Sequence, residues 1–274
     1  MKNIIFLKQY FILFFSLLLI SVCSGSYADT KIDQALEAEH RTPSYVERDQ
    51  YRHPKETLLF FGLTQEQSVI EITPGYGWYA EILAPLLKPK GYYCYASYTL
   101  HKNINPYFVK MEKSFSEKMK KNPEVYSDLN WVHFNPKTPN FPPEGPVDMV
   151  LTFRNVHNWA KAGSAESMFD GFAKALKPGG VLGVVEHRAK PGTPLKTQIK
   201  SGYMTVDYVV RLAKKSGFRL DASSEINANP KDDTNHPGGV WNLPPNMRGI
   251  SDINRDSIKA IGESDRMTLR FVKK

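Results

Sequence analysis

The chain has 274 residues, of which 41% are apolar and 23% charged, so it can bury one substantial core or at most two small ones. The formal net charge is +8, but the densest basic stretch, residues 110–121, is interrupted by Glu112 and Glu117. This pattern is typical of a solvated helix face and argues against nucleic-acid binding.

Residues 1–28 have the pattern of a secretory signal peptide. Two lysines precede an apolar run over residues 10–22, and small residues ending at Ala28 provide a cleavage site. A lipid-anchored Cys23 and an uncleaved anchor are the alternatives. In all three cases the folded domain is expected to be periplasmic or secreted, and cleavage would leave no membrane span. Cleavage would also lower the net charge by two, to +6, and leave Cys94 without a disulfide partner.

Residues 29–62 are predicted to form a polar, helical segment that packs against the following domain as a lid. Residues 63–274 alternate strand and helix patterns, which indicates βαβ crossovers and a doubly wound, mostly parallel sheet. The predicted strands are 68–72, 92–96, 131–134, 147–153 and 180–187, and the predicted helices are 78–87, 106–121, 165–176 and 205–216.

The C-terminal part has a different pattern. Residues 218–226 and 266–273 alternate like two antiparallel strands. Between them, residues from about 226 to 264 form an insertion rich in Pro, Asn and Gly. An irregular segment of this length in a compact domain suggests a functional role.

The stretch EITPGYGW, residues 71–78, ends the first of these strands and begins the helix that follows. Gly75 and Gly77 permit a tight turn, and the helix start offers free N–H groups. Because ligands of open parallel sheets bind at the carboxyl ends of the strands, the turn is predicted to hold a polar or anionic group. The alternative is a turn that only packs helix on strand. A nicotinamide cofactor is poorly supported, since no acidic residue lies between Glu81 and Glu112 to bind a ribose.

Three segments resemble class I S-adenosylmethionine-dependent methyltransferases. They are the turn at 71–77, DMVLTFRNVHNW at 148–159 and FAKALKPGGVLGVVEHR at 172–188, which match the family's first, fourth and fifth strands in order. GVWNLPP and ESDRMTLRF are similar to an exported branch of predicted methyltransferases. The resemblance implies a seven-stranded Rossmann-like sheet with a reversed C-terminal strand, and S-adenosylmethionine as the cofactor.

The resemblance also implies cofactor-binding residues in the first turn and at the end of the second strand: Glu71, Thr73, Pro74, Gly75, Gly77, Trp78 and Ser97. Two of these positions depart from the family pattern. Thr73 stands where the family usually has its first glycine, and Ser97 stands where it usually presents a carboxylate to the ribose. Trp78 also lies on an apolar helical face, which favours packing.

His157 is the candidate general base, because its His-x-Trp pattern after the fourth strand resembles O-methyltransferases whose histidine deprotonates a hydroxyl. A histidine that hydrogen-bonds a neighbouring loop is the alternative. Arg154 and Asn155 are candidates for binding an anionic or carbonyl group of the substrate, and Trp241 for forming a wall of its pocket. The alternatives are a structural ion pair for Arg154 and packing beneath the loop for Trp241. No metal site is predicted, since one short cluster of Asp and His in a loop, residues 232–236, is weak evidence, and turn chemistry explains the Asn-Pro and Pro-Gly-Gly residues around it.

The sequence therefore predicts methyl transfer from S-adenosylmethionine to an unknown small-molecule acceptor outside the cytoplasm. The alternative is a non-catalytic extracytoplasmic protein that binds a ligand on the same fold.

Overall fold

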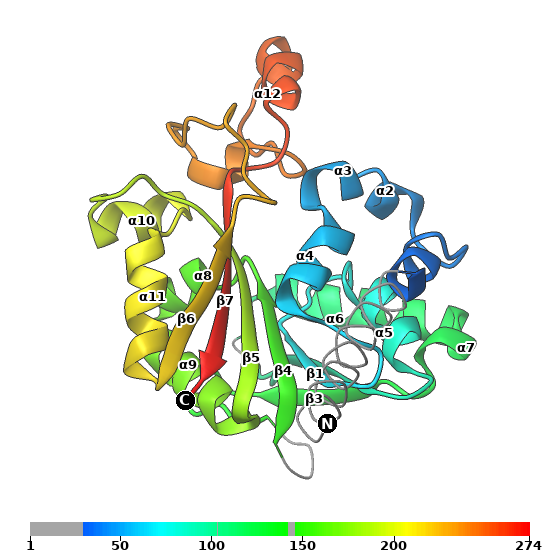
Figure 1. Ribbon diagram of the computed structural model, residues 1–274. Helices are drawn as coiled ribbons and strands as arrows, with labels where there is room; N and C mark the ends of the chain where they lie inside the picture. The colour runs from blue at the N-terminus through cyan, green and yellow to red at the C-terminus, as the bar shows by residue number, and fades with distance from the viewer. Residues whose placement is uncertain (1–29, 103, 142–145) are drawn as a thin grey trace, which may run out of the picture.

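The computed structural model describes residues 30–102, 104–141 and 146–274, so the predicted signal peptide lies outside the described residues (Figure 1). Its centre is a seven-stranded sheet in the order β3-β2-β1-β4-β5-β7-β6. The strands are β1 (Ser68–Ile72), β2 (Tyr92–Tyr98), β3 (Asn130–Phe134), β4 (Val147–Phe153), β5 (Leu176–His187), β6 (Phe218–Ser224) and β7 (Arg266–Lys273). Strand β7 runs antiparallel to its neighbours β5 and β6, which confirms the predicted sheet with a reversed C-terminal strand.

Helices cover both faces of the sheet (Figure 1). Residues 30–36 are helical, and the helices after them are α2 (Pro43–Val46), α3 (Asp49–Arg52), α4 (Pro54–Phe61), α5 (Ala80–Leu87), α6 (Pro106–Lys121), α7 (Pro123–Tyr126), α8 (Val156–Ala162), α9 (Ala165–Ala175), α10 (Leu195–Ser201), α11 (Val206–Lys215) and α12 (Arg255–Ile261). One face packs against α8, α9 and α11, and the other against α4, α5, α6 and α7. In the described part of the chain, no helix combines the length and apolar character needed to cross a membrane.

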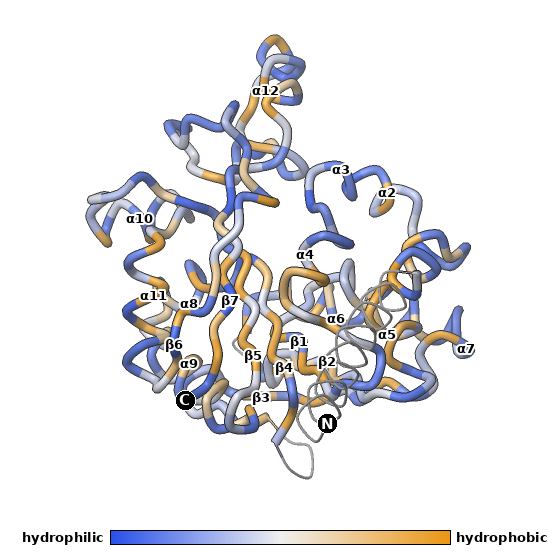
Figure 2. Tube along the Cα trace, viewed as in Figure 1, coloured by the Kyte–Doolittle hydropathy of each residue, from blue (hydrophilic) through white to orange (hydrophobic). Residues whose placement is uncertain are grey.

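The central strands form because their residues are apolar on both faces. Strand β4 reads VDMVLTF and is buried at six of its seven positions, as expected for a parallel strand covered on both sides. Figure 2 shows hydrophobic residues concentrated along the central strands, while α3 is hydrophilic. The edge strand β6 instead alternates exposed positions with half-buried ones after a single buried residue, Phe218. The core therefore lies on both faces of the central strands.

The N-terminal helical segment is bound to the sheet domain by a buried carboxylate. Glu81 in α5 is fully buried, and it accepts hydrogen bonds from the backbone N–H of Thr42 at 2.9 Å and from its hydroxyl at 2.6 Å. The Lys118 ammonium of α6 pairs with the same carboxylate. These contacts hold the segment ahead of α2 against α5 and α6.

The C-terminal insertion has more structure than its sequence predicts. It contains α12 and two short 3-10 helices, η1 (Gly239–Asn242) and η2 (Asp252–Asn254). Its main anchor is buried Asp232, which accepts from the Tyr203 hydroxyl at 2.9 Å and from the Asp265 N–H at 2.8 Å. In Figure 1 the insertion lies beyond the carboxyl ends of the parallel strands, on the same side of the sheet as α2 and α3.

Some predicted element bounds differ from the structure. The predicted helix 78–87 begins at Ala80, because the glycine turn continues to Tyr79. Strand β5 begins at Leu176, four residues before the predicted start, because Leu176 pairs with Val147 across an irregularity in β4. The segment after β4, read as a loop, contains the short helix α8, and His157 lies in its first turn.

Candidate functional site

The glycine turn reverses the chain between β1 and α5 at the carboxyl edge of the sheet. Thr73, Gly75 and Gly77 all have left-handed backbones, with φ of 52°, 70° and 80°. The Thr73 N–H donates to the Ala96 carbonyl at 2.7 Å and holds the turn against the end of β2. No described residue accepts a hydrogen bond from the N–H groups of Gly75, Tyr76 or Trp78. The turn therefore presents free backbone donors, as the sequence predicts.

The two glycines of the turn have different surroundings. A Cβ at Gly77 would lie 2.4 Å from the Phe115 ring, so this glycine is needed for the packing of α6 against the turn. A Cβ at Gly75 would meet only the Met111 sulfur, at 3.8 Å. The packing interpretation therefore explains Gly77, whereas Gly75 is the position that a ligand can approach.

The space beside Gly75 is nearly filled in this conformation. A cavity of about 10 Å³, enough for one water, lies between the turn, the end of β2 and α6. Its lining includes Thr73, Gly75, Ser97, Tyr98, Phe108 and Met111. The Ser97 hydroxyl accepts from the Trp131 indole N–H at 2.8 Å and keeps its own proton available to donate. The donors suit a polar ligand, but Phe108 and Met111 must move to admit one larger than water.

Glu71 is buried within the sheet domain and bonded to the neighbouring strand. The Tyr93 hydroxyl donates to its carboxylate at 2.6 Å. Burial raises the pKa of Glu71 to about 8, although Tyr93 and the charge of Arg154 oppose the shift. The carboxyl group is therefore largely protonated at neutral pH, and its contact with Tyr93 supports the base of the turn.

The residues after β4 connect the glycine turn to β5. The Asn155 amide donates to the Ile72 carbonyl at 3.0 Å, so Asn155 holds the turn in place. Arg154 has a left-handed backbone, with φ of 61°, and its N–H donates to the Val185 carbonyl at 2.7 Å. Its guanidinium group forms no hydrogen bond or ion pair with any described residue.

His157 and Glu186 form a buried pair where β4 and β5 end. His157 Nδ1 lies 3.0 Å from Glu186 Oε1, and the same oxygen accepts from the His187 N–H at 2.8 Å. Because an ionised carboxylate only accepts, this contact places the proton of a neutral His157 on Nδ1 and leaves Nε2 as an acceptor. The Trp241 ring packs edge-on against the imidazole at 6.0 Å, and the His187 ring lies 5.4 Å away.

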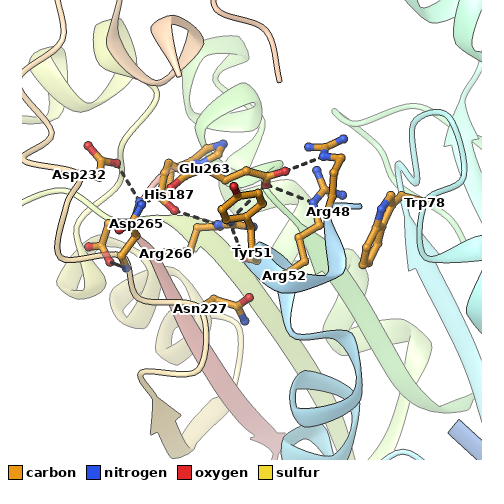
Figure 3. A network of polar contacts seen from close by, with 12 residues as sticks. Arg48, Tyr51, Arg52, Trp78, His187, Asn227, Asp232, Glu263, Asp265 and Arg266 are labelled. Carbon is orange, nitrogen blue, oxygen red and sulfur yellow. Dashed lines mark hydrogen bonds and ion pairs between the residues drawn. The ribbon is translucent and has the colours of Figure 1, made fainter. Parts of the chain in front are cut away.

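A cluster of arginines surrounds one buried carboxylate, that of Glu263, near His187 (Figure 3). Glu263 binds Arg48 Nε at 2.6 Å, and both Arg52 and Arg266 at 3.2 Å. Burial alone would raise the pKa of Glu263, but these arginines hold it well below its usual range. The Arg52 guanidinium also lies 4.6 Å above the Trp78 ring, so Trp78 supports the arginines rather than facing the turn.

His187 lies between the His157–Glu186 pair and the arginine cluster around Glu263. Its Nδ1 lies 2.6 Å from the Ser264 hydroxyl, next to Glu263 in the chain. Burial lowers the pKa of His187 well below its usual value, and the charges of Arg154, Arg266 and Arg52 lower it further. The histidine pair and the arginine cluster therefore belong to one electrostatically coupled site.

Two sets of described side chains have a geometry that a metal ion could use. They are His157 with Glu186 and His187, and Asp232 with Asp233 and His236. In the first set Glu186 already accepts three hydrogen bonds, and in the second Asp232 accepts four. Hydrogen bonding within the protein thus accounts for both arrangements.

A larger hollow of about 390 Å³ lies away from the predicted site residues, between the loop after β5, the start of α11 and the insertion. Of the two cations in its lining, Arg188 is paired with Asp265 at 2.8 Å and with Glu225 at 2.8 Å, whereas the exposed Lys190 forms no ion pair with a described residue. The hollow therefore offers room and one exposed lysine, whereas the region of Arg154 and His157 combines a guanidinium group with an oriented, buried imidazole.

The sequence indicates part of this site. The run Arg48-Asp49-x-x-Arg52 is predicted to be an ion-pair cluster that holds the N-terminal segment, and the structure supplies its carboxylate, Glu263. The roles of Glu263, Arg266 and His187 are not predicted, because their contacts join segments more than 200 residues apart or cross between β5 and β7. The sequence feature that could have indicated these roles is the charged ESDR stretch at 263–266, which contains Glu263 and Arg266.

Comparison with known proteins identifies the fold. No protein-family model and no curated protein matches this sequence. Among solved structures, an S-adenosylmethionine-dependent methyltransferase from Aquifex aeolicus aligns at TM-score 0.54 and 14% identity, over 90% of this chain and 98% of that one. The (4+2)-cyclase SpnF aligns at TM-score 0.57 and 13% identity, over 86% and 85%.

A third structure, from Galdieria sulphuraria and assigned as a sarcosine dimethylglycine methyltransferase, aligns at TM-score 0.54 and 14% identity, over 82% of this chain and 84% of that one. At these identities the likeness shows a shared fold. A cyclase among the three shows that the fold supports more than one kind of chemistry.

The buried Glu71 carboxyl predicts a pH-dependent stability. The folded protein keeps a proton that the unfolded chain releases near pH 4.5, so this stability is fully present below pH 4.5 and is lost as pH rises through about 8. At about 1.4 kcal/mol per pKa unit the loss is on the order of 5 kcal/mol.

Glu71→Gln should therefore flatten the fall in unfolding free energy between these pH values, measured by urea denaturation. Glu47→Gln, which removes an exposed carboxylate, is the matched control and should keep the wild-type slope. Equal slopes for the wild type and Glu71→Gln would show that the Glu71 carboxyl does not cause the loss of stability.

Proposed function

We propose that this protein transfers a methyl group from S-adenosylmethionine to a small-molecule acceptor. The observation that carries the proposal is the buried His157–Glu186 pair, 3.0 Å apart, at the carboxyl edge of the sheet that also carries the glycine turn. Known methyltransferases with the same fold support it. An open parallel sheet places both features at its ligand-binding edge.

The residues of the turn fit the chemistry of the cofactor. The free N–H groups at Gly75 and Tyr76 suit its carboxylate, and the Ser97 hydroxyl suits a ribose hydroxyl. When bound, the cofactor supplies an electrophilic methyl group on a sulfonium ion. The side chains of Phe108 and Met111 must move away from the turn to make room for it.

His157 would act as the general base. Glu186 holds the imidazole through Nδ1, so Nε2 can take the proton from an acceptor hydroxyl as its oxygen attacks the methyl carbon. The charge that develops on the imidazole is stabilised by the Glu186 carboxylate. Trp241, packed 6.0 Å from the imidazole, would form a wall that positions the acceptor.

A non-catalytic ligand-binding protein on the same fold is the second candidate. The observation that favours it is the cavity of about 10 Å³ beside the turn, which cannot hold a nucleoside without movement of α6. The proposed export of the protein also favours it, because S-adenosylmethionine is made in the cytoplasm. That export rests on residues 1–28 alone.

Cofactor binding is the first test of the proposal. Calorimetric titration of the purified protein with S-adenosylmethionine and S-adenosylhomocysteine should give micromolar affinity. Gly75→Asp should weaken binding at least tenfold, because it places a carboxylate beside the donors of the turn.

Gly163→Asp is the matched control, since Gly163 has a similar φ of 67° and open surroundings at the end of α8. Wild-type protein that is folded but binds neither compound would remove the methyltransferase proposal and favour the non-catalytic protein.

The role of His157 as the general base is tested in a turnover assay, with any acceptor that supports release of S-adenosylhomocysteine. His157→Gln should lower kcat by about 10² to 10⁴ with little change in cofactor affinity, because it removes the proton acceptor and keeps the fold. Asn158→Gln, at an exposed neighbouring position in α8, should keep wild-type turnover. Unchanged kcat in His157→Gln would show that the histidine has only a structural role.

A further inference from the structure

The arginine cluster carries more positive charge than the protein neutralises. Arg48, Arg52, Arg154 and Arg266 act electrostatically on one another and on Glu263, so four guanidinium groups share one carboxylate, for a net charge of +3. Glu71, on which the charge of Arg154 also acts, has a pKa raised by burial to about 8 and is mostly neutral at pH 7. Buried charge of one sign is unfavourable unless a counter-charge joins it.

Arg154 is the member of the cluster without a partner. Arg48, Arg52 and Arg266 each bind Glu263. No described residue lies within ion-pair or hydrogen-bond distance of the Arg154 guanidinium, and the residue is only partly buried, so part of it remains accessible. Burial lowers the pKa of Arg154 to about 10, which leaves it charged at neutral pH.

The backbone holds Arg154 in a costly conformation. A φ of 61° is rare for a residue with a side chain of this size and is energetically unfavourable. The 2.7 Å bond from the Arg154 N–H to the Val185 carbonyl fixes that conformation at the end of β4. Strain of this kind concentrates at ligand-binding and active sites.

The unpaired arginine is next to the proposed base. The charges of Arg154, Arg52 and Arg266 all lower the pKa of His187. The His187 ring lies 5.4 Å from the ring of His157. Arg154 also acts on Glu71, at the base of the glycine turn. An anionic group bound here would therefore hold the rest of its molecule near both His157 and the turn.

We propose that Arg154, with Arg48, Arg52 and Arg266 around it, binds the oxyanion group of a small molecule, a carboxylate or a phosphate. If the proposed methyl transfer is correct, that molecule is the acceptor. Guanidinium groups bind planar carboxylates and phosphates through paired hydrogen bonds, and Arg154 has all its donors free. The bound anion would supply the counter-charge that Glu263 provides only in part.

Binding of simple anions tests this site without the cofactor, so its outcome is independent of methyl transfer. The full-length protein is titrated calorimetrically at low ionic strength with inorganic phosphate and with malonate. We expect at least one of them to bind with submillimolar affinity, and the preferred anion identifies the group as phosphate or carboxylate.

Arg154→Gln should weaken that binding at least tenfold. Arg211→Gln removes the same charge from an exposed position in α11 and should bind like the wild type. Arg154→Gln should also unfold at or above the wild-type temperature, because it removes an unpaired charge.

Three results would overturn the proposal. They are no binding of either anion, equal binding in the wild type and Arg154→Gln, or a clear loss of stability in Arg154→Gln. The last result would show that Arg154 has a structural partner.

Discussion

The Glu263 carboxylate joins the N-terminal helical segment to the start of β7. It binds Arg48 and Arg52 of the N-terminal segment and Arg266 at the start of β7, within 3.2 Å of each. Removal of one partner of a buried ion pair typically costs 3–5 kcal/mol, because a charge is left uncompensated. Together with the Glu81 and Asp232 contacts, this cluster therefore fixes the N-terminal helices and the insertion at the carboxyl edge of the sheet.

This arrangement divides the carboxyl edge into two parts with different chemistry. The glycine turn offers backbone N–H groups and a hydroxyl in a nearly closed space. The second part offers an oriented imidazole, that of His157, and an unpaired guanidinium, that of Arg154. Asn155 links them, because its amide bonds to the Ile72 carbonyl at the base of the turn. In the proposed function, the first part would hold the cofactor and the second the acceptor.

Much of the fold is predictable from the sequence, because it rests on local patterns. Buried parallel strands such as β4 are continuous apolar runs, and β1, β4 and β7 begin and end where the sequence predicts. The glycine turn is also local. The arginine cluster is less predictable, since Arg48 and Glu263 meet across 215 positions. No sequence pattern shows that Phe108 and Met111 fill the space beside Gly75, because that depends on how α6 packs.

A crystal structure of the protein with S-adenosylhomocysteine tests the two-part site most directly. The account predicts that the nucleoside lies between the Gly75 turn and Ser97, with Phe108 and Met111 displaced from their present positions. His157 and Glu186 should keep their contact. A ligand found elsewhere, for instance in the hollow beside Arg188, with α6 unmoved, would contradict the account.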